Sequence, residues 1–176
     1  IGMMYLVLTA LLALQVSSSV LEKFILIYKS LEQGVDLKVH ENTKSLERIK
    51  ATVRETGSRP KDVVVLDTAL KVRQETKKVV DHVDGLKKKL IELAGGKDKK
   101  TGIPKGLKND AVVAQLMIHG GKANELQKLL NGYMRHLSEV TQKQYAAIAL
   151  DAKDSALYKG DPNQHGKNFA CLNFDH

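Results

Sequence analysis

From Val20 to Thr56 a stripe recurs every three or four positions, which is the period of one face of an α-helix, and all its residues are apolar except Asn42 and Thr56. The repeat is kept by Val20, Phe24, Ile27, Leu31, Val35, Val39, Asn42, Leu46, Ile49, Val53 and Thr56. The phase does not change across Gly34. We therefore expect one continuous helix from about Gly2 to Thr56, and the alternative is a break at Gly34 that gives two helices.

Two more stretches with the same period follow. The segment Gly57-Ser58-Arg59-Pro60 combines a helix stop, a capping residue and an early-helix proline, so a second helix is expected to start there and to end before Gly95-Gly96. Residues 97–108 are expected to form a loop. A third helix is expected from about Asp110 to Ala147, with a kink at Gly120-Gly121.

Three long helices joined by short connections pack antiparallel and bury their apolar stripes against one another, so the predicted fold class is an all-α helical bundle. Leu, Ala, Lys, Glu and Gln dominate the composition, which also argues against an all-β fold. The first stripe supplies the predicted core residues Phe24, Ile27, Leu31, Leu46, Ile49 and Val53. From Asp151 onward no period is left, and we expect a bundle that is truncated at the C-terminus or completed by another chain.

Charged residues are absent from residues 1–21, although they make up 27% of the chain. A helix of 21 residues is about 31 Å long, close to the thickness of a bilayer core. The sequence therefore predicts a transmembrane helix over residues 1–21 and a helical domain over residues 22–176. The alternative is a cleaved signal peptide, with Val16 and Ser18 before the cleavage site.

The predicted membrane helix has two unlike faces. Small, hydroxylated or aromatic residues share one face: Gly2, Tyr5, Thr9, Ala13, Ser17 and Val20. The opposite face carries Met4, Leu8, Leu11 and Leu14. Because small residues allow close helix approach and hydroxyls offer hydrogen bonds, the first face is expected to meet protein. The alternative is a plain anchor in which Thr and Ser are incidental.

The remaining residues give little indication of a ligand-binding or catalytic site. The net charge of +8 is concentrated between Lys87 and Lys108, which carry eight lysines against two acidic residues. A solvated helix end and loop is the favoured interpretation, with anionic lipid or phosphate binding as the alternative. No aromatic residues interleave with these lysines, which argues against nucleic-acid binding.

Catalysis and metal binding are not predicted either. The histidines at positions 40, 82, 119 and 136 are expected to be surface or capping residues. His165, Cys171, Asp175 and His176 lack the regular spacing of a zinc site. No arrangement suited to nucleophilic or acid–base catalysis is present, so we predict a protein that is not an enzyme and needs no cofactor or metal.

Residues 1–17, IGMMYLVLTALLALQVS, are specific enough to suggest a family. They resemble the amino-terminal membrane helix of the GldM/PorM family, the inner-membrane proteins of gliding motility and type IX secretion in Bacteroidetes. The resemblance continues through Val20, Leu21 and Phe24 to about Leu31. The tail at residues 168–176 is similar to the approach to the last helix of the family's first periplasmic domain.

The resemblance implies a molecular motor. In this family two copies of the chain form a homodimer whose membrane helices lie inside a ring of a small two-span protein, GldL/PorL, with five copies expected. The motor is thought to convert the proton motive force into movement, which further C-terminal domains pass to periplasmic and outer-membrane components that drive protein transport and gliding.

The resemblance also implies where the residues named above lie in the cell and in the complex. The N-terminus would be cytoplasmic and the residues from Glu22 onward periplasmic, on a single-pass protein of the bacterial inner membrane. The face with Gly2, Tyr5, Thr9, Ala13 and Ser17 would face the ring, and the first stripe would form the core of the bundle or the dimer. A different class of function also fits: a single-span sensor whose periplasmic helical bundle binds a small ligand.

Overall fold

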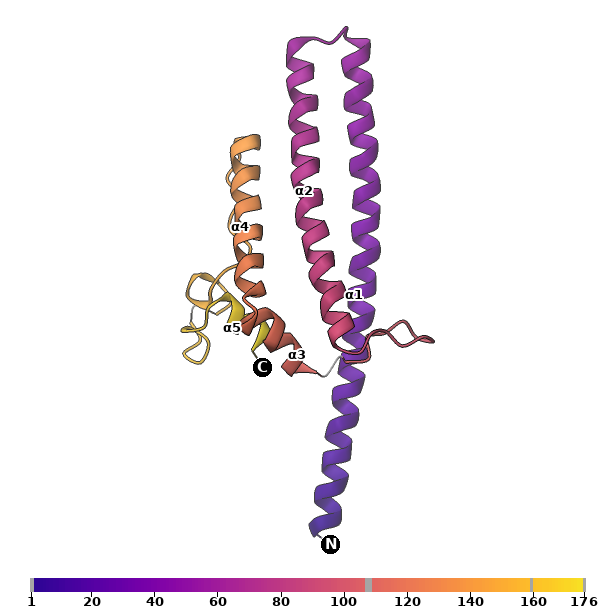
Figure 1. Ribbon diagram of the computed structural model, residues 1–176, viewed down its shortest axis with the longest axis vertical. Helices are drawn as coiled ribbons and strands as arrows, with labels where there is room; N and C mark the ends of the chain where they lie inside the picture. Colours follow the sequence, from indigo (N-terminus) through magenta and orange to yellow (C-terminus); the bar gives the residue numbers. More distant parts are fainter. Residues whose placement is uncertain (1, 107–108, 159, 176) are drawn as a thin grey trace. The chain divides into compact units, whose positions relative to one another are not determined.

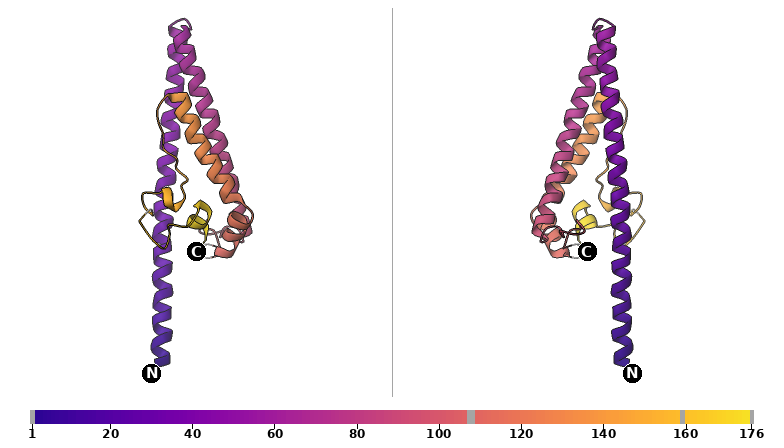
Figure 2. Two further views of the ribbon diagram at one scale, coloured as in Figure 1. Left: turned by 90° about the vertical axis from the view of Figure 1, so that its left-hand side faces the viewer. Right: turned by 90° about the vertical axis from the view of Figure 1, so that its right-hand side faces the viewer.

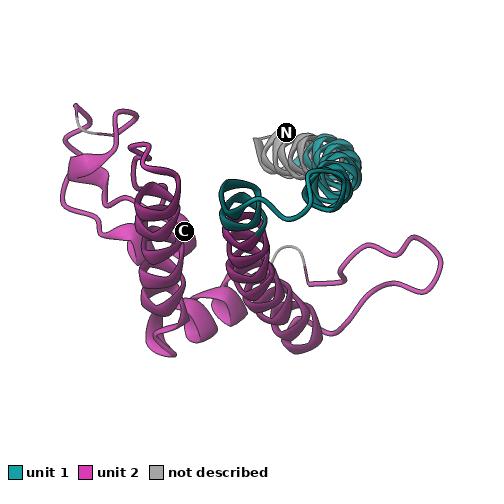
Figure 3. Ribbon diagram, turned by 90° about the horizontal axis from the view of Figure 1, so that it is seen from above, with its two compact units in different colours: residues 1–66 teal, residues 67–176 magenta. Residues whose placement is uncertain are grey.

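The computed structural model describes residues 2–106, 109–158 and 160–175, and at residues 2, 3 and 5–22 it describes the backbone alone. Its regular elements are α1 (Gly2–Glu55), α2 (Pro60–Leu93), α3 (Asp110–Val113), the π-helix η1 (Ala114–His119), α4 (Lys122–Thr141), the 3₁₀-helix η2 (Ala152–Asp154) and α5 (Phe169–Phe174) (Figure 1). Within the described ranges no strand forms, which confirms the expected all-α class. The chain divides into two compact units, Ile1–Leu66 and Asp67–His176 (Figure 3).

The first unit is dominated by α1, which is a single helix of 54 residues. The expected continuous helix is therefore confirmed, and the break at Gly34 is not found (Figure 1). A Cβ atom at Gly34 would meet nothing within 4 Å, so no close contact requires glycine at this position. Among the residues searched, which are the described ones, no helix combines the length and the apolar character needed to cross a membrane. Of the predicted span 1–21, only Met4 is described with its side chain.

A tight turn ends α1 and starts α2. Gly57 and Ser58 adopt left-handed backbone conformations with φ of 66° and 58°, and the Ser58 amide donates to the Val53 carbonyl over 2.8 Å. The Thr56 hydroxyl donates to the Asp62 carboxylate over 2.7 Å, which ties the end of α1 to the first turn of α2. Pro60 is the first residue of α2, as expected, because its missing N–H needs no partner there.

The second unit has a small core of its own. Its buried members are Leu116, Met117, Ala123 and Ala170, with Leu86, Leu90, Val113, Leu126 and Phe174 packed against them. η1 contacts α3, α4 and α5, and α4 contacts α5, so these four elements lie together in the second unit (Figure 2). Phe169 and Ala170 are buried, and α5 therefore contributes to this core.

The third helix departs from the sequence prediction at two places. The kink expected at Gly120-Gly121 is a complete break, because η1 ends there and Gly121 takes a left-handed conformation with φ of 70° before α4 begins. The expected end at Ala147 is wrong, because α4 stops at Thr141 and Gln142 is left-handed with φ of 54°. The residues that follow turn back along α4 and bond to its side chains, as described below.

Candidate functional site

An exposed apolar surface runs along the middle of α1. Its residues are Phe24, Ile27, Tyr28, Leu31, Val35 and Val39, which we call the α1 face. Their spacing of three or four places them on one side of the helix. Phe24 is 63% exposed and Leu31 65% exposed. Single exposed apolar residues are common, but a contiguous apolar stripe is typical of a surface that binds protein or lipid.

The predicted core residues of α1 fall into two groups. Leu46 and Val53 are buried, with 7% and 8% exposure, and Ile49 is half-buried. Phe24, Ile27 and Leu31 lie on the same side of the helix but are exposed. The assignment of the six residues to a bundle or dimer core stays a prediction.

The residues predicted to face a membrane ring are Gly2, Tyr5, Thr9, Ala13 and Ser17. Their backbone lies in α1, but their side chains lie outside the described residues. Their role therefore stays a prediction.

A polar clamp on α4 holds the segment that follows it. The Asn131 side chain donates from Nδ2 to the Ala149 carbonyl over 2.8 Å and accepts the Ala149 amide at Oδ1 over 3.1 Å. One helical turn earlier, Gln127 donates from Nε2 to Asp151 Oδ1 over 3.0 Å. The same carboxylate oxygen accepts the Phe169 amide over 2.8 Å. The clamp thus connects α4, the returning segment and the start of α5.

Sequence reasoning missed this clamp. The available signal was the pair Gln127 and Asn131, which stand four positions apart and therefore lie on one helix face. Their partners are mostly backbone atoms of Ala149, and a backbone atom leaves no mark in the sequence.

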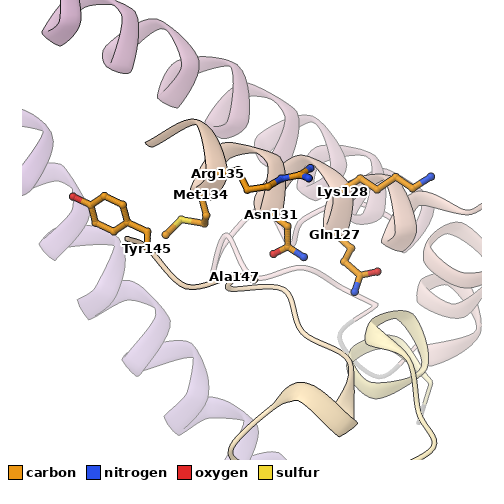
Figure 4. A pocket seen from close by; sticks show the side chains of 7 residues that line it. All are labelled: Gln127, Lys128, Asn131, Met134, Arg135, Tyr145 and Ala147. Carbon is orange, nitrogen blue, oxygen red and sulfur yellow. The ribbon is translucent and has the colours of Figure 1, made fainter. Parts of the chain in front are cut away.

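A pocket of ≈ 370 Å³ lies beside the clamp (Figure 4). It is lined by Gln127, Lys128, Asn131, Met134, Arg135, Tyr145 and Ala147. The side-chain amides of Gln127 and Asn131 are already bonded to Ala149 and Asp151, so they are not free to orient a ligand. These two amides therefore serve to hold the returning segment.

The contact between α2 and α4 within the second unit contains polar groups. The hydroxyls of Thr76 and Tyr133 are 2.6 Å apart and share a hydrogen bond. The Nε2 atoms of His82 and His136 are buried and have no hydrogen-bond partner among the described residues. Both histidines are half-buried, so the expectation that they are surface or capping residues is met only in part. Both lie where α2 and α4 pack, a tertiary contact that the local pattern does not encode.

Two glutamates next to these histidines are ion-paired. The hydrogen bond from Lys78 is the main cause of the lowered pKa of Glu75, and the positive charges of Lys78 and His136 add to it. The hydrogen bond from Lys122 likewise lowers the pKa of Glu125. Among the described residues, no three His, Cys, Asp or Glu side chains gather in a way that would hold a metal ion.

The loop after α2 is ordered by one carboxylate. Asp98 Oδ1 accepts the amides of Lys100 and Thr101, each over 2.9 Å, and the Thr101 hydroxyl over 3.1 Å. These hydrogen bonds lower the pKa of Asp98, those to the Thr101 and Lys100 amides most. The Asp98 amide in turn donates to the Ile103 carbonyl over 2.8 Å.

Comparison with known protein families gives a match over most of the chain. The family model of the GldM N-terminal domain matches residues 19–176. No curated protein and no solved structure matches the chain.

Proposed function

Because the chain belongs to the GldM/PorM family, a component of the gliding-motility and type IX secretion machinery, we propose that it is the force-transmitting part of an inner-membrane motor. In this proposal the chain is not an enzyme. It receives energy from the proton motive force at the membrane and passes mechanical work through the periplasm to the secretion and gliding apparatus.

The continuity of α1 is the observation that carries the proposal. Its 54 residues correspond to a helix of about 81 Å. The helix begins in the uncharged segment 1–21 and continues without a break into a segment rich in charged residues. A helix of this kind moves as a stiff rod, whereas a flexible linker of Gly and Ser would absorb a displacement instead of passing it on.

The proposal places residues 1–21 in the inner membrane, with the N-terminus in the cytoplasm and the domain from Glu22 onward in the periplasm. Two copies of the chain would sit within a ring of a small two-span protein, GldL/PorL. A phenol is a poor proton carrier at neutral pH, so the proton-binding carboxylates would belong to the ring. Tyr5 and Thr9 would face that ring.

A substitution at Gly34 tests the transmission of force. Gly34→Pro removes a backbone donor and places a ring against the preceding turn, which kinks or breaks a helix. Gly34→Ala is the matched control, because the space around Gly34 is open and alanine favours the helix. We expect Gly34→Pro to abolish type IX secretion and gliding at normal protein levels in the membrane fraction, and Gly34→Ala to retain both activities.

Full secretion by a stably expressed Gly34→Pro variant would refute the rod mechanism. The partner assignment is tested separately by gentle detergent extraction of the membrane. Co-purification of a small two-span protein in excess over this chain supports the motor. Extraction of a dimer alone would contradict the motor.

A further inference from the structure

The pocket beside the clamp lies entirely within the second unit, between one face of α4 and the segment that returns along it (Figure 4). Its volume of ≈ 370 Å³ is within the range of ligand sites in proteins. The side-chain amides of Gln127 and Asn131 line the pocket but are engaged in the clamp. The proposed function assigns no role to the other residues that line it.

The polar side chains of the lining that are not engaged in the clamp are Lys128, Arg135 and Tyr145. Lys128 and Arg135 form no ion pair with a described Asp or Glu, and no carboxylate belongs to the lining. Ammonium and guanidinium groups only donate hydrogen bonds, and a phenol can donate one. The free polar groups of the pocket therefore fit a ligand that presents negatively charged acceptors.

The rest of the lining is apolar. It consists of the Met134 side chain, the ring of Tyr145 and the methyl group of Ala147. Methionine is unbranched and adapts its shape to different apolar groups. Ile148 follows in the returning segment and adds an apolar side chain that is 58% exposed. A ligand that fits this surface therefore combines an apolar group with negative charge.

The pocket is an open groove and not an enclosed cavity. Of its lining residues, Lys128, Arg135, Tyr145 and Ala147 are exposed and none is buried. Small-molecule sites bury most of the surface of their ligand, which an open groove does not do. A peptide chain laid along the groove gains contact over its length instead.

The returning segment is also nearly extended beside the pocket. The Tyr145 amide donates to Ser138 Oγ over 3.0 Å, and the Ala149 amide donates to Asn131 Oδ1 over 3.1 Å. These two anchors are seven residues apart on α4, which is about 10.5 Å. Four residues of fully extended chain reach about 14 Å, so the segment between the anchors is close to extended.

The backbone of this segment offers free hydrogen-bonding groups. The amides of residues 146–148 donate no hydrogen bond to any described residue. An extended peptide satisfies such groups when it is added as a neighbouring strand, and side-chain pockets then give the specificity.

We propose that this groove binds an extended acidic peptide segment of a partner protein. One apolar side chain of the peptide occupies the pocket, its carboxylates pair with Lys128 and Arg135, and its backbone bonds to residues 146–148. Because these ion pairs are exposed, the affinity is modest and falls with salt. All of these residues belong to the second unit, so the site does not depend on the proposed membrane placement of residues 1–21.

NMR of the methionine methyl groups tests the proposal on the full chain in a mild non-ionic detergent. Met134 lines the pocket, whereas Met117 is 2% exposed in the core and serves as an internal reference. The variant Met134→Leu assigns the Met134 signal. The probe is the peptide Gly-Glu-Glu-Leu-Glu-Glu-Gly. One control peptide has Lys in place of every Glu, and a second has Gly in place of Leu. A small-molecule probe, N-acetyl-leucinate, carries the same apolar group and a single carboxylate.

We expect the acidic peptide to shift the Met134 signal in a saturable way and to leave the Met117 signal unchanged. Both control peptides and N-acetyl-leucinate should bind at least about fivefold more weakly, because each lacks part of what the groove recognises. Binding of the acidic peptide should also weaken at about 0.5 M salt, where charges are strongly screened.

The protein variants test the two cations. The double change Lys128→Gln and Arg135→Gln should raise the Kd of the acidic peptide at least about fivefold, as expected for the loss of two exposed ion pairs. The matched control is Lys99→Gln with Lys153→Gln, two exposed lysines outside the pocket lining. It lowers the net charge equally and should keep the Kd within about twofold of the wild type.

The absence of a saturable Met134 shift with the acidic peptide would overturn the proposal. Equal binding of either control peptide would overturn it as well, because the groove would then select neither charge nor an apolar group. N-acetyl-leucinate that binds as tightly as the peptide would make the pocket a site for small anions instead. An equal rise of the Kd in the control variant would show that only the overall charge matters. None of these results bears on the proposed function.

Discussion

Replacing Asn131 with alanine should open the segment that returns along α4. The change removes two hydrogen bonds, one of 2.8 Å to the Ala149 carbonyl and one of 3.1 Å from the Ala149 amide. Ala149 is only 1% exposed, so water does not readily replace the lost partner. The carbonyl keeps a bond of 3.3 Å from Gln127, whereas the amide loses its Asn131 acceptor. Leaving that donor unpaired, together with the loss of the second bond, should cost about 2–3 kcal/mol.

Hydrogen–deuterium exchange measures this cost directly. A loss of about 2–3 kcal/mol in the free energy of local opening corresponds to roughly 30- to 150-fold faster exchange at the Ala149 amide. Asn124→Ala is the matched control, because Asn124 is exposed on the same helix. It should leave exchange at Ala149 within about twofold of the wild type, as surface substitutions usually change stability little. Exchange at Ala149 that is unchanged in Asn131→Ala, or equally accelerated in the control, would refute the clamp.

Three further changes test the second unit. Met117→Ala should lower the free energy of unfolding by about 2–4 kcal/mol, measured by urea denaturation, because Met117 is 2% exposed in the core. Thr76→Val should cost about 1–2 kcal/mol by leaving the Tyr133 hydroxyl without its partner, and a double-mutant cycle with Tyr133→Phe should show coupling. Because the pKa of Asp98 is lowered from 3.8, its contribution to loop stability is present above pH 3.8 and is lost as the pH falls through the lowered pKa. The Thr101 amide shift should follow that loss in an NMR titration, with a midpoint below pH 3.8, and should not do so in Asp98→Ala.

The first two helices could be predicted because their determinants are local. The period of the stripe predicts α1 from Gly2 to Thr56, and the structure has it from Gly2 to Glu55. The left-handed Gly57 and the proline at position 60 mark the end of one helix and the start of the next through backbone preferences alone. Such signals act within a few residues and are therefore visible in the sequence.

The third helix shows where local reasoning fails. Gln144 and Ala147 continue the helical spacing of the stripe, yet α4 ends before them and Gln142 is its C-cap. What competes with the helix is the clamp, in which the Asn131 side chain bonds to backbone atoms 18 residues later. The helical pattern carries no information about that distant partner. The same limit applies to the Nε2 atom of His82, which is buried although the local pattern predicts a surface histidine.

The stripe on α1 raises a different question, because one pattern has two outcomes. The spacing is the same from Phe24 to Val39 and from Leu46 to Val53, but the first part is exposed and the second is largely buried. Apolar periodicity therefore indicates which side of a helix is suited to a partner, and not which surface covers it. The apolar side chains from Phe24 to Val39 are not buried within the chain. A large exposed apolar stripe of this kind promotes association with another surface. A continuous stripe allows different partners to pack on successive parts of the same helix. In the proposed homodimer, the second copy of the chain would pack on the part from Phe24 to Val39.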